Sequence, residues 1–130
     1  MKKLSIILLS VIISSALWAQ VPVISFDSIT YDFKKIKEQD GMATIVFKFK
    51  NSGDAPLVIN RVQASCGCTT PTWTKEPVLP GKAGEVTVAY NPANRPGAFI
   101  KSISVFSNAG TAPTVLIIKG EVIPKPAVGR

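Results

Sequence analysis

Cys66 and Cys68 are the only two cysteines of this 130-residue chain, and a single glycine separates them in the stretch "ASCGCTT" at 64–70. Side chains two positions apart on extended backbone point to the same side, and Gly67 lets the chain bend between them. The two sulfur atoms are therefore expected to lie close together. Such a pair could carry out redox chemistry, hold a metal ion, or form a structural or incidental bond.

Three interpretations of the cysteine pair remain open. A bond between Cys66 and Cys68 closes a loop of only three residues, which is worth about 1.6 kcal/mol at most before strain is subtracted. A bond of this kind is comparatively easy to reduce, so thiol redox chemistry is conceivable. Two thiolates are too few for structural zinc, but they could hold Cu(I), or two chains could pool four sulfurs.

Histidine is absent from the sequence. This absence excludes a Ser-His-Asp triad, a Cys-His nucleophile and a His-ligated zinc site within the chain. The eight carboxylates are dispersed, so nothing favours a carboxylate-pair hydrolase, and no glycine-rich phosphate loop is present. We therefore predict a protein that is not an enzyme and needs no cofactor, with copper as the one ligand that the thiols could take.

The N-terminus has the layout of a secretory signal peptide. Lys2 and Lys3 precede an apolar and small-residue run at 4–17, and Ala19 is a plausible last removed residue. The run is shorter than a membrane span of about 20 residues, although a short anchor is the alternative. We predict a signal peptide at 1–19, a mature chain in the periplasm or at the cell surface, and no integral membrane span in that mature chain.

The charge balance argues against nucleic-acid binding. The chain carries a net charge of +7, which falls to +5 without the two lysines of the signal peptide. The lysines are scattered, and the one tight cluster, "KKIK" at 34–37, has no interleaved aromatic residues. We interpret the positive charge as a contribution to solubility and to weak attraction toward an anionic envelope surface.

The mature sequence is typical of short strands separated by turns. Seven segments are rich in β-branched and aromatic residues or alternate between apolar and polar positions, namely 23–27, 30–33, 43–50, 57–64, 84–90, 99–107 and 114–122. In the segment 57–64 the apolar residues change face between Ile59 and Val62, which predicts a kink or a change of sheet. Proline and glycine residues lie mostly between these segments.

This pattern predicts an all-β, immunoglobulin-like β-sandwich of about seven strands, with a barrel as the main competitor. The single domain is expected at 20–123, followed by a disordered tail or short linker at 124–130. Alternation along the strands assigns eight side chains to the core between the two sheets: Ile45, Phe47, Val86, Val88, Ile103, Val105, Leu116 and Ile118.

Several stretches, above all "NSGDAPLVI" followed by "SCGCTTP", resemble the exported bacterial family of domains of unknown function numbered 1573. The resemblance runs from about Ile24 to Val122. It implies an immunoglobulin-like fold akin to the ASH and major-sperm-protein type domains, which serve as binding or scaffold modules. One departure is Lys34, which stands after "DF" where the family often has glycine.

The sequence therefore predicts a non-enzymatic module that binds another protein or a surface polymer in the cell envelope. The alternative is a thiol redox or copper-binding protein that uses Cys66 and Cys68. We expect these cysteines to pair with each other at the rim of the sandwich, near Trp73 and outside the core, because the flanking residues are small and polar. The possible binding rim consists of Gly67, Thr69 and Trp73.

Overall fold

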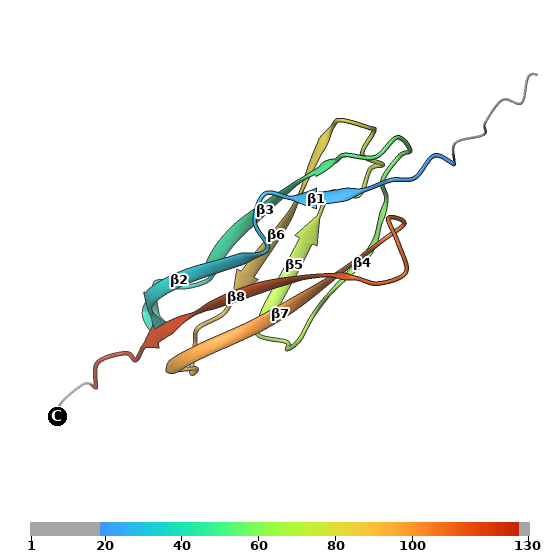
Figure 1. Ribbon diagram of the computed structural model, residues 1–130. Helices are drawn as coiled ribbons and strands as arrows, with labels where there is room; N and C mark the ends of the chain where they lie inside the picture. The colour runs from blue at the N-terminus through green and yellow to red at the C-terminus, as the bar shows by residue number, and fades with distance from the viewer. Residues whose placement is uncertain (1–18, 128–130) are drawn as a thin grey trace, which may run out of the picture.

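The computed structural model describes residues 19–127, which form two four-stranded β-sheets (Figure 1). The strand order is β1-β3-β6-β5 in one sheet and β2-β8-β7-β4 in the other. The elements are β1 (Ile24–Phe26), β2 (Thr30–Lys37), the 3-10 turn η1 (Glu38–Asp40), β3 (Ala43–Asn51), β4 (Ile59–Ala64), β5 (Thr69–Trp73), β6 (Ala83–Tyr90), β7 (Gly97–Ser107) and β8 (Thr114–Ile123). The predicted all-β sandwich is confirmed, and the predicted signal peptide lies almost wholly outside the described residues.

All seven predicted strand segments are strands, and the structure adds β5. The sequence of β5, "TTPTW", lacks an apolar alternation and contains Pro71, so it was not expected to pair. It is an edge strand, beside β6 alone, and proline is tolerated at a sheet edge because no neighbour needs its missing N–H.

The core lies between the sheets, as the alternation predicted. Seven of the eight assigned side chains are at most 3% exposed. Ile45 is only half-buried, although it packs against the core. The reason is the length of β1, which pairs with β3 only at Phe49, Lys50 and Asn51 and leaves the Ile45 half of β3 without a neighbour on that side.

The predicted change of face in β4 is a β-bulge. The register between β4 and β7 shifts between Ile59 and Arg61. In a regular strand, Ile59 and Val62 would point to opposite faces, because they are an odd number of positions apart. The extra residue of the bulge turns the strand locally, so that both side chains are buried in the core.

A second bulge interrupts β2, where the register with β8 shifts between Asp32 and Lys35. At this point Lys34 has a φ of 62°. The left-handed conformation is open to glycine at little cost, but it brings the Cβ of any other residue close to a carbonyl oxygen. The lysine that departs from the family pattern therefore occupies a backbone position suited to glycine.

Replacing Lys34 by glycine is expected to raise the free energy of unfolding by about 1 kcal/mol, because it removes this steric conflict. The exposed ion pair that the change deletes, between Lys34 Nζ and Asp32 Oδ2 at 3.6 Å, contributes little. Thermal unfolding measures the difference. Lys35→Gly, one position further in the strand, is the control and should destabilise the protein by roughly 0.5–1 kcal/mol; equal effects of the two changes would contradict the assignment.

Asn51 organises the end of the sandwich at which the described chain begins. Its side chain is fully buried and makes four hydrogen bonds. The amide nitrogen donates to the carbonyl oxygens of Ala55 at 2.7 Å and Val78 at 2.9 Å, and the amide oxygen accepts from the N–H groups of Gly53 and Val23. One side chain thus ties together the N-terminal segment, the turn after β3 and the segment before β6.

Candidate functional site

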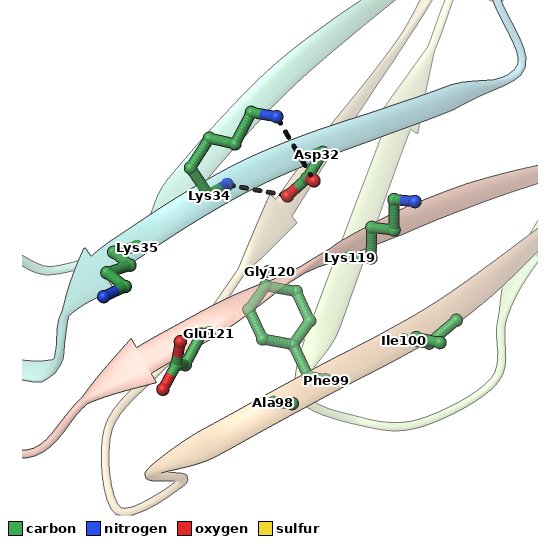
Figure 2. A pocket seen from close by; sticks show the side chains of 9 residues that line it. All are labelled: Asp32, Lys34, Lys35, Ala98, Phe99, Ile100, Lys119, Gly120 and Glu121. Atoms are coloured by element: carbon green, nitrogen blue, oxygen red, sulfur yellow. Dashed lines mark hydrogen bonds and ion pairs between the residues drawn. The ribbon is translucent and has the colours of Figure 1, made fainter.

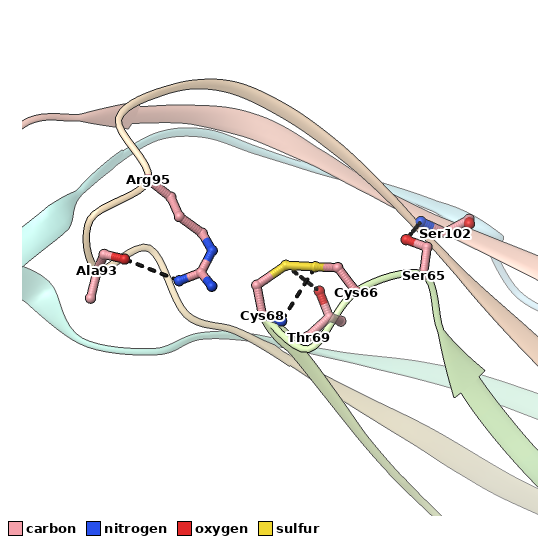
Figure 3. Close-up of a disulfide and its surroundings, with 7 residues drawn as sticks. All are labelled: Ser65, Cys66, Cys68, Thr69, Ala93, Arg95 and Ser102. Atoms are coloured by element: carbon pink, nitrogen blue, oxygen red, sulfur yellow. Dashed lines mark hydrogen bonds between the residues drawn. A yellow bond between two sulfur atoms is a disulfide. The ribbon is translucent and has the colours of Figure 1, made fainter.

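The two cysteines lie in the four-residue connection that carries the chain from β4 in one sheet to β5 in the other. A disulfide joins Cys66 to Cys68, with the Cα atoms 5.3 Å apart (Figure 3). The connection is fixed to both sheets: the Ser65 N–H donates to the carbonyl oxygen of Ser102, and the Cys68 carbonyl oxygen accepts from the Asn91 N–H at 2.8 Å. The disulfide is therefore held on a rigid support at one end of the sandwich.

Burial differs sharply across this loop. Gly67 at its tip is exposed, Cys66 is half-buried, and Cys68 is only 4% exposed and belongs to the core cluster. The expectation that both cysteines lie outside the core is therefore wrong for Cys68. Cys68 is held there because the loop turns at this point, with the Thr69 N–H donating to the Cys66 carbonyl oxygen, and because the Asn91 N–H at the end of β6 donates to the Cys68 carbonyl oxygen.

The predicted binding rim of Gly67, Thr69 and Trp73 does not form one surface. Thr69 is buried, and it pairs with Tyr90 at one end of β5, whereas Trp73 pairs with Val86 at the other end. Four residues of extended strand span about 13 Å, so Trp73 is not beside the disulfide. Its half-buried ring instead lies under Lys75, whose Nζ is 3.1 Å from the ring centroid.

Polar groups surround the two sulfur atoms unequally. The Cys68 N–H donates to Cys66 Sγ at 3.3 Å, and the Thr69 hydroxyl lies 3.7 Å from Cys68 Sγ. Arg95, from the loop between β6 and β7, donates to the Ala93 carbonyl oxygen and directs its guanidinium toward the disulfide (Figure 3). Burial raises the pKa of the neighbouring Tyr90, and the positive charge of Arg95 opposes that rise.

Reducing the disulfide is expected to cost little folding free energy. The bond closes so short a loop that the expected loss is at most about 1.6 kcal/mol. Urea unfolding with and without excess dithiothreitol measures the loss, after a thiol titration has established the oxidation state of the protein as isolated. A loss of several kcal/mol on reduction would show instead that the bond is a structural staple.

A second candidate site is an open groove of about 440 Å³ on the sheet formed by β2, β8, β7 and β4 (Figure 2). The centre of the groove is apolar, because the Phe99 ring packs against Gly120. A Cβ atom added to Gly120 would lie 3.0 Å from the ring, so only glycine leaves room for it. Ile100 beside it is 71% exposed. Charged residues of β2 and β8 complete the lining, namely Asp32, Lys34, Lys35, Lys119 and Glu121.

The charges of the groove are largely paired across the two strands. Asp32 is opposite Lys119, and Lys35 is opposite Glu121. The Lys34 N–H donates to Asp32 Oδ1 at 2.8 Å, and this bond, together with the charges of Lys34 and Lys119, lowers the pKa of Asp32. The groove thus keeps an excess of one positive charge around an apolar centre.

The groove was not predicted from the sequence. The signal available was Ile100, which follows Phe99 directly and so breaks the alternation of β7 with a large apolar residue on the outer face. The role of Glu38 was also missed. Its two carboxylate oxygens accept from the Lys125 and Asn94 N–H groups, each at 2.9 Å, and these bonds lower its pKa. The first part of the predicted tail is therefore attached to the domain.

Metal binding and membrane insertion are two further possibilities for the described part of the chain. Within residues 19–127, no three His, Cys, Asp or Glu side chains come close enough together to hold a metal ion. Binding of Cu(I) by the two thiolates alone stays a prediction. None of the helices in this range is long and apolar enough to cross a membrane.

Several solved structures have a similar fold. A protein of unknown function from Porphyromonas gingivalis W83 aligns with a TM-score of 0.68 at 21% identity, over 79% of this chain and 48% of that chain. The VesB protease of Vibrio cholerae aligns with a TM-score of 0.62 at 15% identity, over 75% of this chain and 31% of the protease. A family 123 glycoside hydrolase from Clostridium perfringens aligns at 0.62 and 12%, over 81% of this chain and 27% of the hydrolase.

At these identities the likeness concerns the fold alone, and this chain spans less than half of each of these solved chains. No curated protein matches the sequence. The model of a protein family described as "Protein of unknown function (DUF1573)" matches residues 24–122, which include both cysteines, the Asn51 turn and every residue that lines the groove. The chain therefore belongs to the DUF1573 family.

Proposed function

We propose that the protein is a non-catalytic β-sandwich module of the cell envelope that binds a partner protein or surface polymer through the groove over β2, β8 and β7. The observation that carries this proposal is Ile100, a large apolar side chain that is 71% exposed beside the apolar centre of a groove whose lining includes charged residues. Burying such a side chain against a partner is favourable, at about 25 cal/mol per Å² of apolar surface.

Two further observations support the proposal. The sequence has no histidine and begins like an exported protein, which fits a binding role in the periplasm or at the cell surface. The same fold forms 31% of the VesB protease chain and 27% of the glycoside hydrolase chain, so it also occurs as one part of larger proteins. Both observations agree with a binding module that has no catalytic activity.

The chemistry of the groove indicates the kind of partner. An extended segment with apolar side chains would cover Ile100, and acidic groups beside it would meet the excess positive charge of the lysines. The rim charges should mainly set the rate of association and its salt dependence, whereas the apolar centre should set the lifetime of the complex.

The test is site-specific photo-crosslinking of the exported protein in its own cell envelope. A photoreactive phenylalanine is placed at position 100 or, as a matched control, at Thr72, which is exposed on the outer face of the other sheet. We expect a discrete adduct from position 100 and none from position 72. Equal labelling at both positions, or none at position 100, would overturn the proposal.

The identified partner is then measured against two variants. Ile100→Asp should lower the affinity by at least about tenfold while leaving the melting temperature nearly unchanged, because the side chain is largely exposed. The double variant Cys66→Ser/Cys68→Ser should retain the partner, since the disulfide residues are not among those that line the groove.

A further inference from the structure

The disulfide presents its two sulfur atoms unequally to solvent. Cys66 is half-buried on a loop whose tip, Gly67, is exposed and has no atom within 4 Å of the position of an added Cβ. Cys68 is 4% exposed and packs into the core. A thiolate approaching from solvent therefore reaches Cys66 and not Cys68.

The groups around the disulfide also favour a charged sulfur on one side. If the bond is broken, Cys66 Sγ retains the Cys68 N–H as a donor at 3.3 Å. The Arg95 guanidinium points toward the disulfide from the Cys68 side (Figure 3). A hydrogen-bond donor and a cation both stabilise a thiolate. The Thr69 hydroxyl, 3.7 Å from Cys68 Sγ, is placed to assist the sulfur that leaves.

We propose that the Cys66–Cys68 disulfide is a redox site that takes two electrons from a dithiol of another protein, with Cys66 as the sulfur attacked. This activity goes beyond the binding role of the groove and does not depend on it. Stabilisation of the reduced form makes a disulfide a stronger oxidant. The short loop adds to this tendency, because its closure gives the oxidised form little stabilisation.

The reaction balances in two exchange steps. A thiolate of the partner attacks Cys66 Sγ, the bond between the two cysteines breaks, and Cys68 Sγ leaves with the electron pair and is protonated from solvent. The second partner thiol, as its thiolate, attacks the partner sulfur of the mixed disulfide and releases Cys66 as a thiolate. The partner dithiol is oxidised to a disulfide, and the disulfide of this protein is reduced to two thiols.

The first experiment tests the inequality of the two sulfurs. In the Cys68→Ser variant Cys66 is the remaining thiol, and in the Cys66→Ser variant it is Cys68. We expect 5,5′-dithiobis(2-nitrobenzoate) to react with the Cys66 thiol at least about tenfold faster than with the Cys68 thiol, because accessibility and thiolate stabilisation both favour Cys66. Far-ultraviolet circular dichroism confirms that both variants are folded. Equal rates would overturn the assignment of roles.

The second experiment tests Arg95 with an arginine control. Arg95→Gln should move the midpoint of the rate-versus-pH profile of the Cys66 thiol to higher pH. Arg61→Gln should leave it in place, because Arg61 lies over the Phe106 ring on the β4–β7 side of the sheet. A merely structural role for Arg95 predicts unchanged profiles in both variants, and that result would overturn its part in the proposal.

The third experiment tests the activity itself on the oxidised full-length protein, with reduced dithiothreitol as the model dithiol. We expect the protein disulfide to be reduced at least about tenfold faster than oxidised glutathione under the same conditions, as for an exposed exchange site. A rate equal to or below that of glutathione would show an inert bond and refute the proposal. The groove variant Ile100→Asp should react as fast as the unchanged protein, so failure here is distinguishable from failure of the binding function.

Discussion

Replacing Phe47 by alanine is expected to lower the free energy of unfolding by about 3–5 kcal/mol. The ring is 3% exposed in the centre of β3, and it lies between the two sheets among side chains that are almost completely buried. Alanine would leave a cavity between the sheets. The β3 strand cannot easily move to close it, because its hydrogen bonds to β6 hold it in place. The loss is a large part of the total stability of a small domain, about 5–15 kcal/mol.

The neighbouring position provides the control. Lys48 is exposed on the outer face of β3, opposite Glu85 of β6. Lys48→Ala should change the free energy of unfolding by no more than about 0.5 kcal/mol. Urea unfolding of the two variants measures both effects, and Phe47→Leu keeps the comparison possible if the alanine variant does not fold. Similar losses for Phe47→Ala and Lys48→Ala would mean that the faces of β3 are assigned wrongly.

Changing Asn51 to aspartate is expected to cost roughly 2–6 kcal/mol, although only one group of the side chain changes. The amide nitrogen donates to two carbonyl oxygens, of Ala55 and Val78, and a carboxylate can donate to neither. The Val78 carbonyl oxygen keeps the Leu57 N–H as a donor at 2.9 Å, so the Ala55 carbonyl is the one left without a donor, which costs about 1–3 kcal/mol. The charge of a buried carboxylate that faces two carbonyl oxygens accounts for the remaining cost. Acidification should restore part of the stability, because a protonated carboxyl group can donate one hydrogen bond.

Asn108 is the matched control for this change. Its amide also donates to a carbonyl oxygen, that of Pro56 at 3.0 Å, and accepts from a backbone N–H, that of Val58 at 2.9 Å. Asn108 is exposed, however, so water can replace the lost donor. Asn108→Asp should therefore cost less than about 1 kcal/mol. Comparable losses at the two positions, measured by urea unfolding, would show that burial of the Asn51 amide is not what matters.

The fold was predictable from the sequence because alternation depends only on which face of a strand is buried. Phe47, Val86 and Ile118 are recognisable as core residues in this way, and the change of face in β4 predicted a kink or a change of sheet, at a point where the structure has a bulge. β5 was not predictable by the same rule. Pro71 is acceptable because β5 pairs with β6 alone and lies at the sheet edge. Both properties arise from the tertiary structure and leave no pattern in the local sequence.

The sites depended still more on contacts between distant residues. The sequence identified the cysteine pair from its spacing, but the unequal burial of Cys66 and Cys68 depends on how their loop is held against the end of β6, where the Asn91 N–H donates to the Cys68 carbonyl oxygen. Glu38 reaches its partners Asn94 and Lys125 only after the sheets have assembled, across separations that no motif encodes. The Arg95 side chain likewise points toward the disulfide only in the folded chain (Figure 3). The groove likewise needs three strands side by side before Ile100 and the lysines share one surface.

The parallel ladder between β2 and β8 has a mechanical consequence. The described chain begins beside Asn51 at one end of the sandwich and leaves through Lys125 beside Glu38 at the other (Figure 1). A pull on these two ends acts along β2 and β8 in opposite directions, so that the hydrogen bonds from Thr30–Ile117 to Lys37–Ile123 are sheared together and not opened one at a time. We therefore expect the domain to unfold under tension only at comparatively high force, with the β2–β8 ladder rupturing as a unit.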